Sequence, residues 1–215
     1  MIREGDTLLV ATKNRGKTRE FREAFAPLGV RVVDLNDLAD REIPPIVEDG
    51  ATFEENARIK ARTVAEATGL ITLADDSGLC VDKLGGAPGV HSARYAGPGA
   101  TDAENNAKLL EELRRAAERD GTGDAGSAAR FVCCLVLYNP MTGETVVEEG
   151  TVEGRIVPSP SGTGGFGYDP LFWLPSHGCT MAELSIEEKN RISHRGAALR
   201  RLIGRLSRKR GAGAH

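Results

Sequence analysis

The chain has 215 residues, of which 40% are apolar and 27% are charged, and its formal net charge at pH 7 is −3. This length allows one large domain or two closely joined lobes with a substantial core, and the slight excess of acidic residues argues against a general nucleic-acid-binding surface. Because no apolar run reaches the length of a membrane span and the first residues lack the layout of a signal peptide, we expect a cytoplasmic protein with no nucleic-acid or membrane partner.

The chain opens with the pattern of a strand followed by a helix. Residues 7–12 form a short β-type run, and residues 17–25 have helical character because Phe21 and Phe25 lie one turn apart. A second strand is predicted at residues 30–35.

The polar loop between this strand and this helix has the composition of an anion-binding site. Its residues 11–18, ATKNRGKT, fit the relaxed form A-x-x-x-x-G-K-T of a phosphate-binding loop. Thr12, Asn14 and Lys17 supply a hydroxyl, an amide and a cation at a strand-to-helix junction, which suits a phosphate. A true P-loop is the weaker interpretation, since Ala11 replaces its first glycine and the relaxed pattern occurs by chance in many proteins.

A capping box predicts the next helix. Thr52 is followed three residues later by Glu55, and the helical pattern then runs to about Thr68. Lys60 falls on or beside the apolar face of this helix. A lysine in that place needs an anion or a route to solvent.

Two adjacent aspartates follow the next predicted strand, residues 71–75. If the strand continued, Asp75 and Asp76 would point to opposite faces, so we expect one to serve a site and the other to bind backbone or water in a turn. Together with Glu48 and Asp49 they are the candidates for holding Mg²⁺, which can supply both an activated water and a counter-charge for phosphate chemistry. The alternative is a plain Asx turn.

The second half of the chain continues the alternation. A second capping box predicts a helix over residues 101–119, and the glycine-rich residues 121–128 are expected to form a mobile surface connection. Residues 130–138 and 144–157 have the pattern of a β-hairpin, and residues 180–206 are helical with one interruption. Alternating strands and helices with a hairpin indicate an α/β protein with a mixed sheet.

A glycine-rich loop and a cationic group lie near the end of the chain. Residues 162–167 contain four glycines, which permit close approach of the backbone to a ligand. Phe166 and Tyr168 are expected to be exposed rings on which a planar base can stack. Near the helix interruption the cationic residues are Lys189, His194 and Arg195. Taken alone, such residues usually cover a solvated helix face.

Six segments carry a family resemblance and occur in the family's order over nearly the whole chain. They are ATKNRGKTRE (11–20), FEENARIKA (53–61), ADDSGL (74–79), GGAPGVHSARYAG (85–97), GTGGFGYDPLF (162–172) and EKNRISHRGAAL (188–199). Together they resemble the inosine/xanthosine triphosphate pyrophosphatase family, also called Ham1-like or RdgB-like. Each segment alone is a weak signal, and six in register make coincidence very improbable.

The resemblance implies roles for individual residues. It implies that Asp76 is the general base and a metal ligand, that Lys17 and Lys60 are catalytic, and that Glu48 is a second ligand of Mg²⁺. The nucleotide-binding residues it implies are Thr12, Lys13, Asn14, Arg15, Gly16, Lys17, Lys60 and Ser77 toward the phosphates, and Phe166, Gly167, Tyr168, Asp169, Lys189, His194 and Arg195 toward the base and sugar.

The resemblance also implies an architecture and an activity. The implied fold is an elongated α/β structure with two lobes around a long mixed β-sheet, a nucleotide cleft between the lobes, and a homodimer as the assembly. Residues 1–206 would form a single catalytic domain and residues 207–215 a basic flexible tail.

The implied reaction is hydrolysis of ITP, dITP and XTP to the monophosphate and pyrophosphate. Three alternatives are kept beside it. A P-loop NTPase or kinase would release the γ-phosphate, and a nucleotide-binding sensor would do no chemistry. The related Maf-type pyrophosphatases are disfavoured because their N-terminal signature differs from ATKNRGK.

Overall fold

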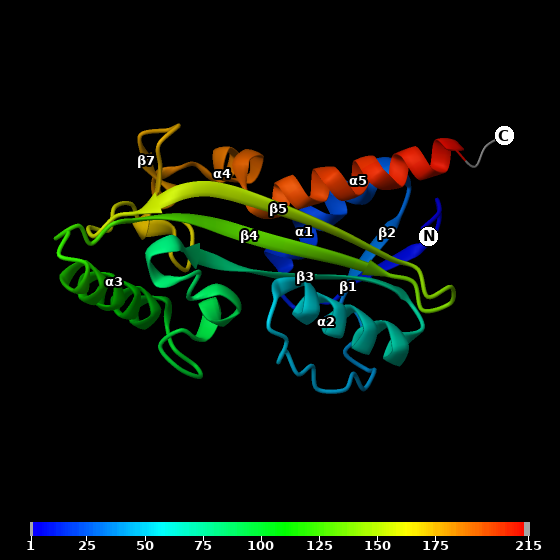
Figure 1. The fold of residues 1–215 in the computed structure, drawn as a ribbon. Helices are drawn as coiled ribbons and strands as arrows, with labels where there is room; N and C mark the ends of the chain where they lie inside the picture. Colours follow the sequence, from blue (N-terminus) through cyan, green and yellow to red (C-terminus); the bar gives the residue numbers. More distant parts are fainter. Residues whose placement is uncertain (1, 213–215) are drawn as a thin grey trace. The chain divides into compact units, whose positions relative to one another are not determined.

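The computed structural model describes residues 2–212, which form alternating strands and helices (Figure 1). The strands are β1 (Thr7–Val10), β2 (Arg31–Asp34), β3 (Ile71–Val81), β4 (Ser127–Tyr138), β5 (Thr145–Ile156), β6 (Phe172–Leu174) and β7 (Cys179–Thr180). The α-helices are α1 (Arg15–Phe25), α2 (Phe53–Thr68), α3 (Asp102–Arg119), α4 (Ile186–Ile192) and α5 (His194–Ala212). No helix within residues 2–212 is both long enough and apolar enough to cross a membrane.

The seven strands form a mixed sheet in the order β2-β1-β3-β4-β5-β6-β7. β1 pairs in parallel with β2 and with β3, whereas β6 is antiparallel to both β5 and β7. The predicted α/β class with a mixed sheet is therefore confirmed.

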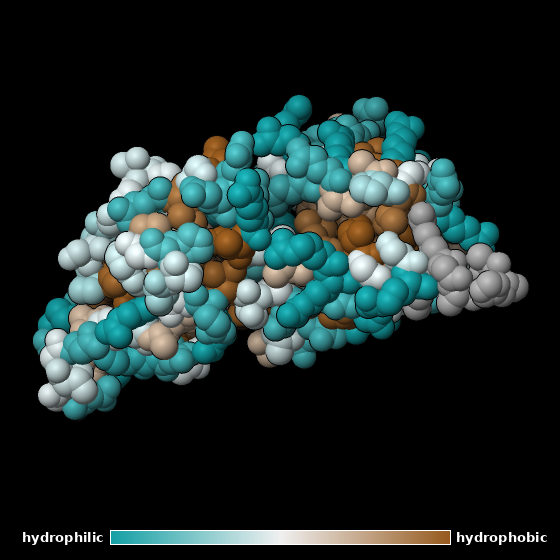
Figure 2. All heavy atoms as spheres, turned by 90° about the horizontal axis from the view of Figure 1, so that it is seen from above, coloured by the Kyte–Doolittle hydropathy of each residue, from teal (hydrophilic) through white to brown (hydrophobic). Residues whose placement is uncertain are grey.

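The chain divides into two compact units. Unit 1 comprises residues 1–76, 133–150 and 197–215, and unit 2 comprises residues 77–132 and 151–196. Each unit has its own buried apolar core. This division agrees with the two expected lobes. The surface seen in Figure 2 is mainly hydrophilic, with brown apolar residues visible between the teal ones.

Unit 1 places helices on both faces of its strands, with α1 and α5 on one face and α2 on the other (Figure 1). Side chains alternate between these faces along each strand. On β1, Leu8 belongs to the core cluster with α1 and α5, and Leu9 belongs to the cluster with α2. On β3, Leu73 belongs to the first cluster and Ala74 to the second. Odd-numbered residues in this part of β3 therefore face α1, and even-numbered residues face α2.

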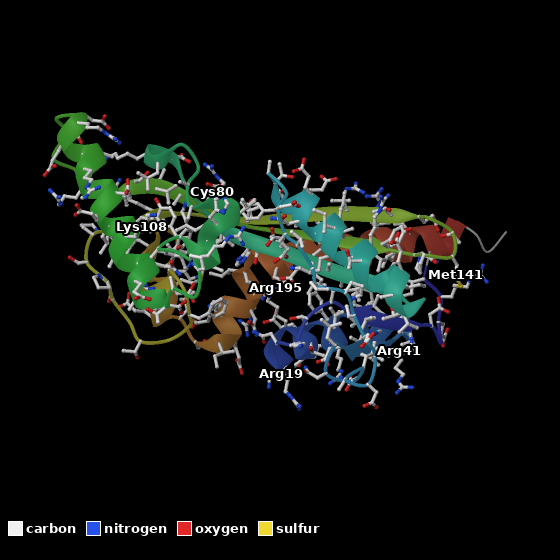
Figure 3. All side chains as sticks on the ribbon, turned by 90° about the horizontal axis from the view of Figure 1, so that it is seen from below. Arg19, Arg41, Cys80, Lys108, Met141 and Arg195 are labelled. Atoms are coloured by element: carbon white, nitrogen blue, oxygen red, sulfur yellow. The ribbon has the colours of Figure 1, made fainter. Side chains whose placement is uncertain are left out.

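Unit 2 packs α3 against its strands. Leu109 and Leu113 of α3 are fully buried in the same core cluster as Leu79 of β3. The rings of Phe131 and Phe172 add to this core, with their centroids 4.5 Å apart. The figure of all side chains shows Lys108 on the surface of this helix (Figure 3).

Both predicted capping boxes are confirmed. The Thr52 hydroxyl accepts the backbone N–H of Glu55, and the Glu55 carboxylate accepts the backbone N–H of Thr52. Thr101 and Glu104 make the same reciprocal pair at the start of α3. Side chains thus satisfy backbone donors that have no partner inside the first turn of a helix.

The expected turn after Asp75 and Asp76 is wrong, because β3 continues without interruption to Val81. β1 pairs with the first part of β3, as far as Leu73. β4 is the neighbour of β3 on its other edge. Pairing within the sheet keeps the chain extended through Ser77 and Gly78, where the local sequence favours a turn.

Two smaller boundaries also differ from the prediction. β4 begins at Ser127, so the last two residues of the expected connection at 121–128 belong to a strand. α5 continues to Ala212, beyond the expected end at Leu206. Most of the expected tail at residues 207–215 is therefore helical backbone, and its residues 213–215 lie outside the described residues.

Candidate active site

The predicted anion-binding loop lies between β1 and α1, and two of its side chains shape it. The Asn14 Oδ1 caps α1 by accepting the backbone N–H groups of Gly16 at 2.9 Å and Lys17 at 3.1 Å. The Thr12 Oγ1 accepts the backbone N–H of Asn14 at 3.1 Å. Thr12 and Asn14 therefore hold the first turn of α1 in place, which directs the Lys17 side chain.

Lys17 pairs with the first of the two aspartates. Its Nζ lies 2.7 Å from Oδ2 of Asp75, whose side chain is 3% exposed. The alternation along β3 explains this choice, since Asp75 lies on the face toward α1. Asp76 lies on the face toward α2 and is half-buried, followed along the strand by the half-buried Ser77. The uninterrupted strand thus separates the two carboxylates onto opposite faces.

Lys60 reaches the same strand from α2. Its Nζ donates a hydrogen bond to the backbone carbonyl of Asp75 at 3.0 Å and forms an ion pair with the Glu48 carboxylate. The side chain of Lys60 is 16% exposed. Of the two possibilities predicted for this lysine, an anion or a route to solvent, the structure provides the anion, which is Glu48. Because the Asp75 carbonyl belongs to the peptide bond with Asp76, Glu48 and that peptide contact the same ammonium group.

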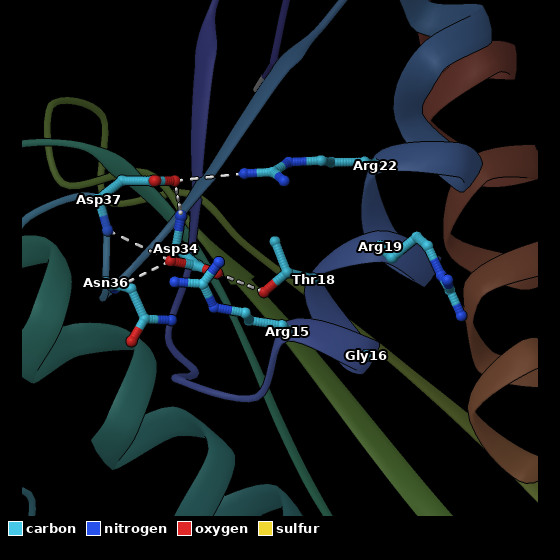
Figure 4. Close-up of a pocket in the computed structure, with 8 residues that line it drawn as sticks. All are labelled: Arg15, Gly16, Thr18, Arg19, Arg22, Asp34, Asn36 and Asp37. Carbon is cyan, nitrogen blue, oxygen red and sulfur yellow. Dashed lines mark hydrogen bonds and ion pairs between the residues drawn. The ribbon is translucent and has the colours of Figure 1, made fainter.

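A cavity of about 480 Å³ lies between α1 and the residues at the end of β2 (Figure 4). Its lining includes Arg15 and Gly16, which were predicted to bind substrate, and the buried Asp34. Asp34 accepts hydrogen bonds from the Thr18 hydroxyl at 2.7 Å and from the backbone N–H of Asn36 at 2.8 Å. Burial opposes ionisation of Asp34, but these hydrogen bonds outweigh it and lower its pKa. Asp34 is therefore a structural carboxylate.

The remaining residue of the loop, Lys13, faces another part of the surface. It is exposed and lines a second cavity of about 290 Å³ with Leu35, Leu38 and Ile43 among others. Its backbone carbonyl accepts a hydrogen bond from Asn36 at 3.1 Å. Lys13 therefore lines a different cavity from Arg15 and Gly16.

The two rings of the glycine-rich loop in unit 2 differ in exposure. Phe166 is 66% exposed. The expectation that Tyr168 is exposed is wrong, because Tyr168 is 5% exposed and its hydroxyl donates a 2.7 Å hydrogen bond to the Ser92 carbonyl. Burial raises the pKa of Tyr168. Within this loop Phe166 is the ring available for stacking on a base.

Asp169 and Lys189 form a second buried acid–lysine pair. Asp169 is 4% exposed, and its Oδ2 forms an ion pair with Lys189 and accepts the backbone N–H of Phe166 at 2.9 Å. The Lys189 Nζ also lies 4.4 Å from the centroid of the Phe166 ring. Gly165 is required here, since a Cβ on it would lie 2.1 Å from the Asp169 Oδ2. The structure thus brings Phe166, Asp169 and Lys189 together.

His194 and Arg195 occupy the first turn of α5. The His194 ring stacks on Phe131 with a centroid separation of 5.3 Å and an interplanar angle of 17°. Arg195 is 7% exposed, and its place at the start of α5 can be seen in Figure 3. His194 therefore packs against a ring of the core. Isolated residues of this type usually cover a solvated helix face instead.

A sequence model of the Ham1 family matches residues 8–205 of this chain. The chain belongs to the Ham1 family. It is 53% identical over 199 residues to a dITP/XTP pyrophosphatase of Streptococcus thermophilus and 51% identical to one of Streptococcus agalactiae. These matches cover 93% of this chain and 59% of each relative. The chain thus spans about three fifths of the length of the curated relatives it matches.

Solved Ham1 structures resemble the fold over almost their whole length. A HAM1 protein from Coxiella burnetii is 43% identical with a TM-score of 0.86, and the match covers 94% of this chain and 99% of that one. The Ham1 protein of Staphylococcus aureus is 39% identical with a TM-score of 0.83, with coverage of 95% and 100%.

The carboxylates of this Ham1 chain fit a magnesium ion that is shared with a phosphate ligand. Within residues 2–212 no group of three or more His, Cys, Asp or Glu residues is arranged to hold a metal. Mg²⁺ is usually bound by one or two carboxylates, with substrate phosphates and water completing its octahedral shell. Glu48, which is ion-paired with Lys60, and Asp76, whose peptide with Asp75 accepts a hydrogen bond from Lys60, are the two carboxylates that would hold the ion.

Several residues that position this Ham1 site were missed by the sequence analysis. Asn56, 2% exposed on α2, accepts the backbone N–H of Gly50 at 2.8 Å and so fixes the backbone after Glu48. Ser92 accepts the Tyr168 hydroxyl through its carbonyl. Asn56 lies one turn before Lys60 on the predicted helix, and this spacing is a signal that could have pointed to it. Nothing in the sequence near Ser92 indicates its partner.

Proposed function

We propose that this Ham1-family protein hydrolyses the noncanonical purine nucleotides ITP, dITP and XTP between the α and β phosphates, releasing the monophosphate and pyrophosphate. The observation that carries the proposal is the convergence of Lys17 and Lys60, from two helices, on the Asp75 residue beside Asp76. Two cations next to a carboxylate provide phosphate binding and a base in one place. The names of the relatives agree with this reaction.

Asp76 is the general base in this proposal. Its carboxylate accepts the proton of a water that attacks the α-phosphorus in line with the leaving pyrophosphate. Lys17 and Lys60 offset the charge that develops on the transferring and leaving groups. Lys17 exchanges its Asp75 partner for a phosphate oxygen, which needs only a rotation of its flexible side chain. When bound by Glu48 and Asp76, Mg²⁺ supplies further counter-charge and makes the water more acidic.

Selectivity is proposed to depend on the 6-keto edge of hypoxanthine and xanthine. Donors placed for that oxygen would face the amino group of adenine without an acceptor. A buried donor without a partner costs about 1–3 kcal/mol, which is roughly a 5- to 150-fold loss per donor. The exposed ring of Phe166 provides the stacking surface for either base.

A pyrophosphate-release assay over ITP, dITP, XTP and ATP, with and without Mg²⁺, tests the proposal. We expect pyrophosphate and monophosphate from the first three nucleotides, much slower turnover of ATP, and loss of activity without the metal. Orthophosphate and diphosphate as products would instead indicate a γ-phosphate-releasing NTPase. Tight binding without any product would indicate a sensor, and equal rates on ATP would refute the selectivity.

We also propose that the protein acts as a cytoplasmic homodimer. The proposal rests on the resemblance that named the family, which implies this assembly. Light scattering behind a sizing column measures the mass in solution, and a mass near twice 22.9 kDa is expected. A monomeric mass at micromolar concentration would refute the dimer.

A further inference from the structure

Two side chains of α3 bind both backbone polar groups of one glycine in the loop at residues 162–167. The Asp102 Oδ2 accepts the backbone N–H of Gly167 at 2.7 Å, and the Asn106 Nδ2 donates to the Gly167 carbonyl at 3.0 Å. Asp102 and Asn106 are four residues apart, so they lie on the same face of the helix one turn apart. All three residues belong to unit 2.

The helix that supplies these groups is firmly fixed at this end. The capping box described above begins α3 immediately before Asp102. Asn105, 3% exposed, accepts the backbone N–H of Ala96 at 2.8 Å and donates to the Ala93 carbonyl at 3.3 Å. Leu109 is fully buried in the core of the unit. The first turns of α3 are therefore a rigid support for the loop.

These hydrogen bonds act on the backbone of Phe166. The N–H of Phe166 is held by Asp169 at 2.9 Å, and the N–H of the following residue, Gly167, is held by Asp102. Both peptide planes that flank the Phe166 Cα are thus held by carboxylates. Asn106 holds the next peptide carbonyl. The ring of Phe166 is 66% exposed, yet the direction in which it leaves the backbone is set.

The stability of α3 alone does not explain an asparagine at position 106. Its Oδ1 is buried and has no hydrogen-bond partner among the described residues, which is unfavourable for folding. An apolar side chain would avoid that cost. What the asparagine adds is the N–H donor that meets the Gly167 carbonyl.

We propose that Asp102 and Asn106 are positioning residues that fix Phe166 as the stacking surface for the purine base. The proposal rests on the proposed function, because it assigns the base of the substrate to this ring. Loosening the loop should weaken binding of the base and leave binding of the phosphates unchanged. Loss of one base–ring stack corresponds to roughly a 5- to 150-fold change in affinity, and we expect a change within that range.

The experiment separates the two ends of the substrate. The KM for ITP and its dissociation constant by calorimetry report the whole nucleotide, and the inhibition constant of inorganic tripolyphosphate reports the phosphate end. Asp102→Ala and the isosteric Asn106→Asp should each raise the KM and the dissociation constant for ITP about 5- to 50-fold. The inhibition constant of tripolyphosphate and kcat should change by less than about 2-fold, which is roughly the agreement expected for sites that do not interact.

Two further variants serve as controls. Asp102→Asn keeps an acceptor oxygen for the Gly167 N–H and should restore most of the affinity for ITP. Asp120→Ala removes an exposed acid from the other end of α3 and should change nothing. If Asp102→Ala fails to fold, as judged by its thermal unfolding, the isosteric Asn106→Asp carries the test.

The outcomes distinguish the two proposals. Unchanged ITP binding in both Asp102→Ala and Asn106→Asp overturns the positioning role. An equal loss of tripolyphosphate binding also overturns it, because that loss would indicate general damage to the structure. A wild-type protein that binds ITP but releases no pyrophosphate overturns the proposed function, while the dissociation constants still decide the role of Asp102 and Asn106. A wild-type protein that does not bind ITP overturns both.

Discussion

The same chemical pair occurs in both compact units on different supports. In unit 1 the buried Asp75 pairs with Lys17, and in unit 2 the buried Asp169 pairs with Lys189. Asp75 stands on an uninterrupted strand of the sheet, whereas Asp169 ends a glycine-rich loop that is held by side chain to backbone hydrogen bonds. The first pair is therefore placed by strand pairing and the second by loop contacts.

This difference indicates what each pair can do. Strand pairing fixes direction closely, and its alternation puts Asp75 and Asp76 on opposite faces, so one carboxylate can orient a lysine while its neighbour accepts a proton. A loop held by side-chain hydrogen bonds presents the exposed Phe166 ring in a set direction, which suits recognition of a base. We expect substitutions in the strand to change kcat most and substitutions in the loop to change KM most.

The largest effect is expected for Asp76→Asn. Removal of a general base slows a reaction by about 10²- to 10⁴-fold, so kcat for pyrophosphate release should fall in that range while binding of ITP by calorimetry is retained. Asp75→Asn is the matched comparison, since it changes the same residue type on the opposite face of β3. It removes the partner of Lys17 and should raise KM with a smaller loss of kcat. A reversed order of the two variants would assign the base to Asp75.

The second effect concerns Lys60. Lys60→Met removes the ammonium between the Glu48 carboxylate and the Asp75 carbonyl, and kcat/KM should fall about 100-fold, as for loss of one donor to developing charge. Arg58→Met is the control on the same helix, because Arg58 pairs with Glu54 on the exposed surface. Its activity should stay within about 2-fold of the wild type. Similar losses in both variants would remove Lys60 from the site.

A moderate effect is expected for Gly165→Ala in the loop of unit 2. The new methyl group would lie 2.1 Å from the Asp169 Oδ2, so the pair with Lys189 must shift and KM for ITP should rise. Gly165 also has a φ of +74°, which costs an alanine about 1 kcal/mol or more. Gly178→Ala separates the two causes, since Gly178 has a φ of +65° and no atom near its Cβ position. An equal rise in KM in both variants would show that strain, and not the displaced Asp169, is responsible.

The parts of the fold that the sequence predicted depend on neighbours in the chain. Both capping boxes were found because Thr52 and Glu55, like the pair that opens α3, interact within one turn. The turn predicted after Asp76 failed because the preference of Ser77 and Gly78 for a turn is local, while the strand is kept straight by its neighbours in the sheet. At Ser77 and Gly78 the pairing of β3 within the sheet therefore outweighs the local preference for a turn.

The same distinction applies to the candidate site. The residue types of the phosphate loop and the need of Lys60 for an anion follow from the sequence alone. The pairing of Lys17 with Asp75 depends on which face of β3 meets α1, and this is decided by sheet register. Tyr168 was expected to be exposed because it lies in a glycine-rich loop. Its burial could not be predicted, because its partner, the Ser92 carbonyl, is 76 residues away in the chain.

The smallest effect concerns a third buried carboxylate, which is held by neutral donors instead of a lysine. Asp34 is 4% exposed, and hydrogen bonds from Thr18 and from backbone N–H groups lower its pKa against the opposing effect of burial. Since the pKa is lower in the folded than in the unfolded protein, its contribution to stability is complete above the unfolded value of 3.8 and is lost as the pH falls through the folded value.

Thr18→Val removes one of these donors with little change in shape. The free energy of unfolding in urea should fall by about 1 kcal/mol at pH 7, and the difference from the wild type should shrink near pH 3. The bond from the Thr18 hydroxyl to the Asn14 carbonyl is also lost, but its contribution does not depend on pH, so part of the difference should persist. Turnover of ITP at pH 7 should be unchanged, because Asp34 holds the start of α1 and has no role in the proposed reaction. A difference that is constant between pH 7 and pH 3 would show that the hydroxyl acts on the helix alone and that Asp34 is not stabilised in its ionised form.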